Sequence, residues 1–170
     1  TGGSTVELAK RFPSSNFVGY DAFLPNIDKA DENARSAGAG GNITFKHWNI
    51  GEGSPGKYDV VACFDLIHDL PDPELGLRVI QESMNQGGLF LLMDIEAEDD
   101  PVDNDGPFGV FKLGISLHFC MTTSMWQGGQ GLGTVGLPET VLRELSQKAG
   151  FSKVSKLDIH HPLNSLYLIE

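Results

Sequence analysis

The chain has 170 residues, of which 40% are hydrophobic and 21% are charged, and its formal net charge is −11. These proportions are typical of a globular protein with one sizeable core. The negative charge argues against contact between this segment and a nucleic acid, and no stretch reaches the roughly 18 uncharged apolar residues of a membrane span. We find no signal peptide and no cysteine spacing typical of disulfides or zinc, so we expect a cytoplasmic protein without a metal.

The first residues, Thr1–Thr5 (TGGST), are typical of the second half of a glycine-rich ligand loop. A capping-box pattern predicts a helix from Ser4 to about Arg11. A short apolar strand, Phe17–Tyr20, then leads to Asp21. Glycines let a backbone approach a ligand closely, and a carboxylate at a strand end accepts hydrogen bonds from ribose hydroxyls. This order therefore predicts a nucleoside-binding α/β unit.

Helical and strand patterns alternate through the following residues, which is typical of a mostly parallel sheet with helices on its faces. Residues at helical spacing predict a helix with an Asn26 cap that ends at Gly38. The apolar run Tyr58–Phe64 predicts a central strand buried on both faces. Asp72 before Pro73 predicts a capped helix start. Further strands are expected at Ile43–Trp48, at Leu89–Asp94 after a Gly87-Gly88 turn, at Lys153–Leu157 and at Ser165–Ile169, and a last helix is expected from Pro138.

The pattern changes between residues 95 and 136. An acidic patch leads into a long apolar helical stretch from Phe108 to about Met125, and a glycine-rich run follows it. The patch consists of Glu96, Glu98, Asp99, Asp100, Asp103 and Asp105. We expect the acidic patch to be a solvated surface and the phenylalanines of the helix, such as Phe111 and Phe119, to lie in the core. Because long insertions in compact domains often shape binding sites, we expect residues 95–136 to form a substrate lid.

The chain resembles the class I S-adenosylmethionine (SAM) methyltransferases over nearly its whole length. The resemblance rests on the order of the elements, on Asp59-Val60-Val61 leading to Phe64-Asp65, and on Gln86-Gly87-Gly88 leading to Asp94. Four segments are also similar to one subgroup, in which a winged-helix-like domain precedes the methyltransferase domain. These segments are Phe64–Asp69, His118–Met121, Gln127–Gly133 and Pro162–Ser165.

The resemblance implies that residues 1–170 are a partial methyltransferase domain with a Rossmann-like α/β sheet. Such a sheet is mostly parallel with an antiparallel last strand, and its first, central strand would be missing from this chain. Strands Phe17–Tyr20 and Tyr58–Phe64 normally flank that strand, and unpaired edges of buried strands are costly. We therefore expect the chain either to be unstable or to pair these two strands directly.

The resemblance also implies that SAM is the cofactor, and it assigns residues to SAM. Gly2 and Gly3 would lie near its methionine portion and Asp21 would bind its ribose hydroxyls. Asn49 stands where many relatives have an aspartate that contacts adenine, and its carbonyl can accept the same hydrogen bond. The full set of expected cofactor-binding residues is Gly2, Gly3, Asp21, Ala22, Asn49, Ile50, Phe64 and Asp65.

His68 follows Asp65 by three residues, at the edge of the sheet where ligands bind. An imidazole titrates near neutral pH, so we expect His68 to take a proton from the methyl acceptor or to orient it. A histidine packed beneath the loop is the alternative. His118, in the insertion, is a second catalytic candidate.

The predicted function is methyl transfer from SAM to a small-molecule acceptor. Whether the protein forms a homodimer is left open. Two alternatives remain at this point. A nicotinamide dehydrogenase would share the glycine loop and the strand-end acid, although the end of the chain fits it worse. A non-catalytic regulatory domain that binds SAM or another metabolite would share the whole donor site.

Overall fold

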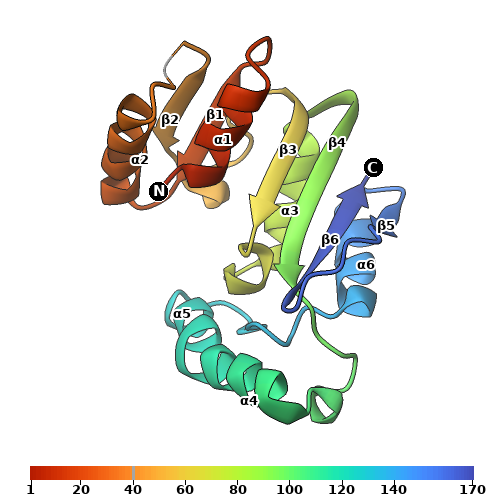
Figure 1. Cartoon of the computed structure of the whole chain (residues 1–170). Coiled ribbons are helices and arrows are strands. Elements are labelled where there is room, and N and C mark those ends of the chain that lie inside the picture. The colour runs from red at the N-terminus through yellow and green to blue at the C-terminus, as the bar shows by residue number, and fades with distance from the viewer. Residues whose placement is uncertain (40) are drawn as a thin grey trace. The chain divides into compact units, whose positions relative to one another are not determined.

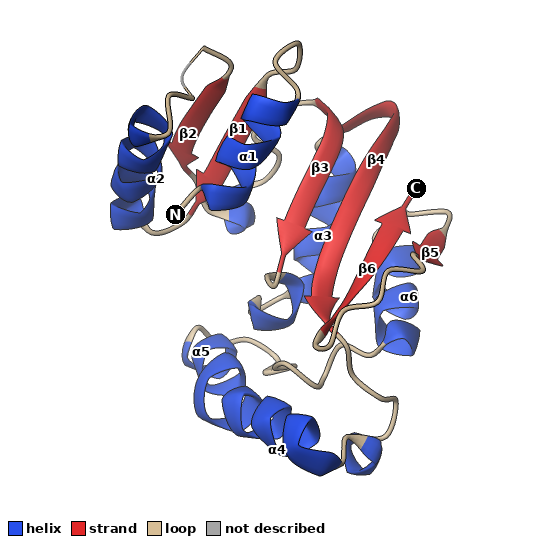
Figure 2. Cartoon of the chain, viewed as in Figure 1, coloured by secondary structure: helices blue, strands red, loops and turns tan. Residues whose placement is uncertain are grey.

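The computed structural model describes residues 1–39 and 41–170, and the chain divides into two compact units. The first unit is Thr1–Pro55 and the second unit is Gly56–Glu170. Helices and strands alternate along both units (Figures 1 and 2), which confirms the predicted α/β class. No helix among the described residues has the length and apolar composition needed to cross a membrane.

The first unit has two parallel strands and two helices. Its elements are α1 (Gly3–Arg11), β1 (Phe17–Asp21), α2 (Leu24–Ser36) and β2 (Ile43–His47). The strands pair in register from Phe17 opposite Ile43 to Asp21 opposite His47. Parallel pairing brings the carboxyl ends of both strands to one edge, where Asp21 is placed.

The second unit is built on a four-stranded sheet in the order β3-β4-β6-β5. Its strands are β3 (Tyr58–Phe64), β4 (Met84–Ile95), β5 (Val154–Lys156) and β6 (Asn164–Ile169). β3 and β4 are parallel, whereas β6 is antiparallel to both of its neighbours, as predicted for the last strand. Helices α3 (Pro73–Glu82) and α6 (Glu139–Lys148) lie behind this sheet in Figure 1. Phe90 of β4 is fully buried and stacks on Phe151 with ring centroids 5.8 Å apart.

The insertion forms a nearly continuous helical stretch. Helix α4 (Gly106–Ile115) passes through a π-helical turn, Ser116–Cys120, into helix α5 (Met121–Trp126). The predicted helical stretch is therefore confirmed. A π-helical turn inside a helix is rare and is often found at functional sites.

Two predicted caps are wrong. Ser4 lies inside α1, because the chain enters this helix through Gly2 in the left-handed conformation, and no side chain caps it. Asn26 lies inside α2, which begins at Leu24 and has a proline in its first turn. The amide of Asn26 instead binds the side chain of Asp21.

The predicted burial of β3 is also wrong. β3 is an edge strand of its sheet, and Val60 is 60% exposed, because β4 is its only strand neighbour among the described residues. Gly87 and Gly88 lie within β4, where the pairing with β3 is irregular, rather than in a separate turn. The strands fall into two sheets, so the direct pairing of β1 with β3 is not found among the described residues. The instability of the chain stays a prediction.

Removing the cap of α3 should lower the stability of the second unit. The Asp72 Oδ1 atom accepts a hydrogen bond from the backbone N–H of Leu75 at 2.9 Å. Asp72→Ala should therefore reduce the free energy of unfolding in urea by about 1 kcal/mol. Asp105 occupies the same position before α4 but makes no capping bond, so Asp105→Ala is a matched control. Equal losses in the two variants would contradict the assigned cap.

Candidate active site

A small cavity lies in the first unit at the carboxyl end of β1. Its volume is about 80 Å³, well below the roughly 300–1,000 Å³ of ordinary ligand pockets. The cavity therefore suits only part of a ligand. Two of the residues predicted to bind the donor, Gly2 and Asp21, meet at this cavity. The complete lining is Thr1, Gly2, Thr5, Gly19, Tyr20, Asp21, Asn26, Ile27, Ala30 and Phe45.

The carboxylate of Asp21 is held by two hydrogen bonds from its own unit. Its Oδ1 atom accepts from the backbone N–H of Phe23, and its Oδ2 atom accepts from the side-chain amide of Asn26, both at 2.9 Å. Each carboxylate oxygen has a further acceptor site. The pair of oxygens is therefore oriented but can still accept hydrogen bonds from two hydroxyl groups.

Gly2 permits the tight contact on the other side of this cavity. Its φ angle is 74°, and a Cβ atom there would lie 2.6 Å from the Phe45 ring and 2.8 Å from Ala30. Only glycine fits both the conformation and the space.

The other predicted donor contacts of the first unit lie outside the lining of this cavity. Gly3 is exposed at the start of α1, and Ala22 bonds through its carbonyl oxygen to His47 Nε2 at 3.0 Å. Asn49 caps a short 3-10 helix, Ile50–Glu52, and its Oδ1 atom accepts from the Gly51 N–H at 2.9 Å. One acceptor site on that oxygen is thus already used, although a second remains.

In the second unit, a histidine–carboxylate pair lies at the carboxyl edge of the sheet. His68 is part of the 3-10 helix Ile67–Asp69, which follows β3, and Asp94 is the penultimate residue of β4. The two residues are 3% and 2% exposed, and His68 Nδ1 lies 2.5 Å from Asp94 Oδ1. Because a carboxylate accepts, Nδ1 carries the proton, which leaves Nε2 of the neutral ring as an acceptor.

The surroundings of His68 favour its protonated form. Burial lowers the pKa of the imidazole, but the hydrogen bond and charge of Asp94, with the charges of Asp69 and Asp65, outweigh it, so the pKa is raised above its ordinary value. His68 Nε2 lies 3.3 Å from Asp69 Oδ1. A proton taken up by Nε2 would therefore be stabilised from both sides of the ring.

Cys120, in the π-helical turn, completes this cluster. Ligand atoms of His68, Asp69 and Cys120 lie within 4.8 Å of one another, so these three could hold a soft divalent cation. A proton on His68, whose pKa those charges raise, also compensates the adjacent carboxylates without a metal ion. We therefore assign the cluster as a proton-binding site.

Phe64 and Asp65, predicted to contact the donor, lie at the end of β3 beside this cluster. Phe64 is 38% exposed. Asp65 has a φ of 49° and is the one described residue other than glycine with a positive φ. Its Oδ1 atom accepts a hydrogen bond of 2.7 Å from the side-chain amide of Asn164.

The insertion is fastened to the turn that carries His68. Ser124 of α5 is fully buried, and its hydroxyl donates to the carbonyl oxygen of Leu70 at 3.1 Å. The backbone N–H of Gln130 donates to the Pro71 carbonyl oxygen, also at 3.1 Å. At Gly129 an added Cβ would lie 2.2 Å from Pro71 Cα. At Gly129 the backbone of the glycine-rich run therefore lies in close contact with the backbone at Pro71.

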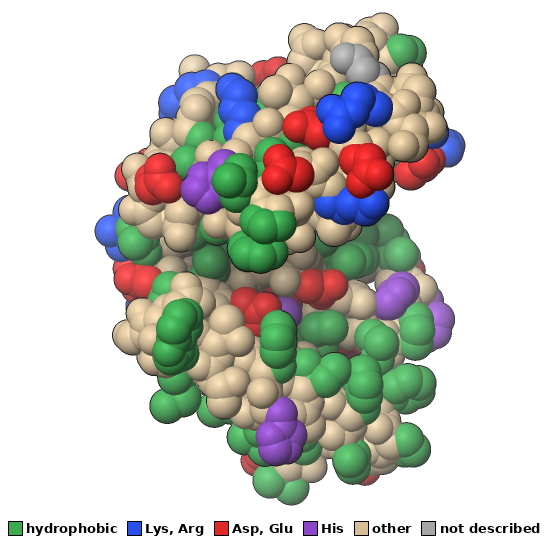
Figure 3. All heavy atoms as spheres, turned by 90° about the vertical axis from the view of Figure 1, so that its left-hand side faces the viewer, with side chains coloured by type: hydrophobic (Ala, Val, Ile, Leu, Met, Phe, Trp, Pro, Cys, Tyr) green, Lys and Arg blue, Asp and Glu red, His purple; other side chains and the backbone are tan. Residues whose placement is uncertain are grey.

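The large side chains of the insertion face outward. The expectation that Phe111 and Phe119 lie in the core is wrong, since they are 53% and 62% exposed. The small residues Ser116, Cys120 and Ser124 are buried in their place. Figure 3 shows hydrophobic side chains at the surface of the lower part of the molecule, where α4 and α5 lie. His118 is exposed on the π-helical turn, while Cys120 on the same turn contacts the His68 cluster.

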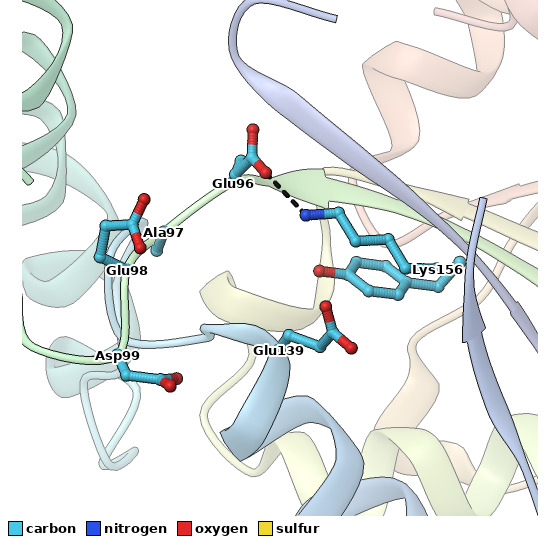
Figure 4. A pocket seen from close by; sticks show the side chains of 7 residues that line it. Glu96, Ala97, Glu98, Asp99, Glu139 and Lys156 are labelled. Atoms are coloured by element: carbon cyan, nitrogen blue, oxygen red, sulfur yellow. Dashed lines mark hydrogen bonds and ion pairs between the residues drawn. The ribbon is translucent and has the colours of Figure 1, made fainter. Parts of the chain in front are cut away.

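A second cavity, of about 190 Å³, lies in the second unit beyond the end of β4. Part of the acidic patch, predicted to be a solvated surface, lines it, and Figure 4 shows Glu96 pairing there with Lys156, at 2.7 Å. Glu139 pairs with Arg143 at 2.6 Å, and Asp99 accepts from Thr140. Two of the four lining acids are thus paired with a cation and a third accepts from a hydroxyl, and we assign no ligand to this cavity. Its lining is Glu96, Ala97, Glu98, Asp99, Glu139, Lys156 and Tyr167.

A family model described as a methyltransferase domain matches residues 1–90, more than half of the chain. The chain belongs to this family. The resemblance to methyltransferases found in the sequence is thereby confirmed, and the dehydrogenase alternative is set aside.

Two curated relatives match parts of this methyltransferase domain. An uncharacterized protein of Synechococcus is 29% identical over 92 residues, which are 53% of this chain and 22% of that protein. The uncharacterized protein RP789 of Rickettsia prowazekii is 36% identical over 72 residues, which are 41% of this chain and 13% of that protein. The matched segments are thus small parts of much longer proteins.

Solved structures show the same fold. PigF with SAH superposes with a TM-score of 0.79 at 21% identity, over 98% of this chain and 46% of that chain. A putative O-methyltransferase from Nostoc punctiforme gives 0.74 at 19% identity, over 97% and 47%. The mitomycin 7-O-methyltransferase MmcR gives 0.74 at 18% identity, over 98% and 45%. The methyltransferase domain described here therefore spans about half the length of these structures.

Adding a methyl group at Gly2 should disturb the cavity of the first unit. Gly2→Ala would place a Cβ against Phe45 and Ala30 and would force a non-glycine residue into a positive φ. We expect a loss of about 1–2 kcal/mol in the unfolding free energy of this unit, measured by urea titration. Gly3→Ala, where an added Cβ has no neighbour within 4 Å, should change it little. A Gly2→Ala variant as stable as Gly3→Ala would contradict the contact.

Asp94→Asn should lower the pKa of His68, since it removes the nearest charge that raises it while burial continues to lower it. A titration followed by NMR of the ring nitrogens measures this directly. Because the folded pKa is raised, the stabilisation by Asp94 should be complete below the unfolded value of about 6.5. It should be lost as the pH rises through the folded pKa. An unchanged His68 titration would contradict the assigned pair.

Proposed function

We propose that this methyltransferase domain transfers a methyl group from SAM to a small-molecule acceptor. The observation that carries the proposal is the buried His68–Asp94 pair at the carboxyl edge of the sheet, in a chain of the methyltransferase family. Two of the solved neighbours support the donor and the reaction class, since one is described with SAH, the demethylated product of SAM, and another as an O-methyltransferase.

The chemistry assigned to His68 is proton removal. An acceptor O–H or N–H attacks the methyl carbon of the sulfonium, a bond from carbon to oxygen or nitrogen forms, and the carbon–sulfur bond breaks. Its electron pair stays on sulfur, which becomes the neutral thioether of SAH. The acceptor proton goes to His68 Nε2, and Asp94 stabilises the imidazolium through Nδ1. The donor is intrinsically reactive, so alignment of the acceptor supplies much of the remaining rate.

We propose that the first unit holds the nucleoside portion of SAM. Asp21 would bind the ribose hydroxyls, and Gly2 would let the backbone approach the ligand; the cavity that both residues line supports this role. Asn49 and Ile50 are proposed for adenine, and Gly3, Ala22, Phe64 and Asp65 complete the proposed donor contacts. The hydrogen bonds that orient Asp21 and leave acceptor sites on both of its oxygens are the strongest support among these residues.

The charges around His68 favour a neutral or cationic acceptor. Asp65, Asp69 and Asp94 all act on the imidazole, and Lys112, which bonds to the Glu96 carbonyl oxygen at 2.7 Å, is engaged elsewhere. An anionic group would be repelled there. An alcohol, a phenol or an amine fits the site better than a carboxylate or a phosphate.

We propose that residues 95–136 cover the acceptor. The hydrogen bonds from Ser124 and Gln130 to the Leu70–Pro71 backbone support this, because they hold the insertion beside the turn that carries His68. His118 remains the second candidate for contact with the acceptor.

The alternative function is a non-catalytic domain that binds SAM or another metabolite for regulation. It shares the donor cavity with the enzyme but does not require His68 to face an acceptor. A cytoplasmic location and a homodimer stay predictions from the sequence.

Two substitutions should separate donor binding from catalysis. Asp21→Ala should weaken SAM affinity about tenfold or more, measured by calorimetry, because it removes both oriented acceptors. His68→Gln should keep SAM affinity but lower methyl transfer about 100-fold or more, measured with labelled SAM across a panel of alcohols, phenols and amines.

Asp28→Ala is the matched control, since Asp28 is an exposed acid on α2 of the same unit. Unchanged affinity in Asp21→Ala would overturn the assignment of that residue. SAM binding with no transfer to any acceptor would favour the regulatory alternative.

A further inference from the structure

Asp65 is held in a strained conformation at the edge of the sheet. Its backbone N–H still bonds to the Met93 carbonyl oxygen at 2.9 Å, as if β3 continued, and the chain then turns with a φ of 49°. A left-handed conformation is uncommon for a residue with a side chain, although aspartate adopts it more readily than most, and such conformations concentrate at functional sites. Its persistence requires a fixed partner.

That partner is Asn164, which comes 99 residues later in the chain. Asn164 is the first residue of β6, is 7% exposed and pairs across the sheet with Ile95. Its backbone N–H donates to His161 Nδ1 at 3.0 Å, which fixes the turn before β6. The side-chain amide therefore reaches Asp65 from a rigid position.

The hydrogen bond engages one oxygen of Asp65 and leaves the other. Asn164 binds Oδ1 at 2.7 Å, and within the described residues no donor binds Oδ2. Asp65 is exposed as a residue while its carboxyl group is partly buried, and its second oxygen can still accept a hydrogen bond from a ligand. A carboxylate with one oxygen fixed and the other accessible suits recognition of a protonated amine or a hydroxyl.

We propose that Asn164 is a positioning residue for methyl transfer, which holds Asp65 so that its second carboxylate oxygen binds an ammonium or hydroxyl group of a ligand. This rests on the proposed function. Two sources carry that chemistry, the amino-acid end of the donor and the acceptor itself. SAH carries the ammonium group, whereas 5′-methylthioadenosine keeps the nucleoside and lacks the amino-acid end.

The test measures the affinity of the protein for SAH and for 5′-methylthioadenosine by calorimetry, and the KM of the best acceptor from the panel. If the donor supplies the ammonium, Asn164→Leu should weaken SAH binding about tenfold and leave 5′-methylthioadenosine unchanged. If the acceptor supplies the group, SAH affinity should stay constant while the acceptor KM rises about tenfold.

Asp65→Asn gives a second variant that keeps the fold. Asparagine tolerates the left-handed conformation and still accepts from Asn164, but it lacks the charge. It should reproduce the loss seen in Asn164→Leu. A structural role alone would instead weaken both nucleoside ligands equally.

The pH profile gives a further readout. Partial burial, with the charges of Asp94 and Asp69, raises the pKa of Asp65, while His68 and the Asn164 hydrogen bond lower it. Loss of Asn164 should raise this pKa further, so the affinity of the variant should fall at a higher pH on acidification than that of the wild type.

The chain offers a matched control pair. Asn85 donates to Asp59 Oδ1 at 2.8 Å, and Asp59 lies near the opposite end of β3. Asn85→Leu and Asp59→Asn should change neither ligand affinity nor KM. If the wild type binds SAH, but Asn164→Leu and Asn85→Leu have the same SAH affinity and also the same acceptor KM, the proposal is overturned and the proposed function is left intact. A wild-type protein that binds no SAH would overturn both.

Discussion

The second unit depends on the hydrogen bond between His68 and Asp94. Both side chains are almost fully buried, and a buried carboxylate without a partner is strongly unfavourable. The turn after β3 must therefore stay against the end of β4. Parallel pairing of these strands up to Phe64 opposite Met93 brings the two groups to the same edge of the sheet. One interaction thus fixes the turn, the tautomer of the imidazole and the direction in which Nε2 faces.

The remaining parts of the site are arranged around that turn. Small residues on one side of the π-helical turn and α5 let the insertion approach it, and Gly129 lets two backbones touch beside Pro71. Cys120 thereby comes close to His68 and Asp69. From the other side, β6 brings Asn164 to Asp65. The site is therefore assembled from segments that are far apart in the chain, and close packing of small residues makes this assembly sterically possible.

Features that depend on a few consecutive residues, such as a helix cap, could be predicted from the sequence when no neighbouring conformation interfered. The Asp72 cap needs only the three residues that follow it, and the structure has the predicted hydrogen bond. The Ser4 and Asn26 caps were wrong because neighbouring conformations decided the helix starts, a left-handed Gly2 in one case and a proline-containing first turn in the other. The burial of β3 was wrong because an apolar run cannot report how many strands flank it.

The sequence by itself determined the alternation of helices and strands, the methyltransferase family and the prominence of Asp21 and His68, because these depend on residue type and short spacing. Only the tertiary structure decided which side chains contact the residues of the site. Asp94 is 26 residues from His68, and Asn164 is 99 residues from Asp65. Strand register and the packing of the insertion bring such residues together, and neither is encoded in a short stretch of sequence.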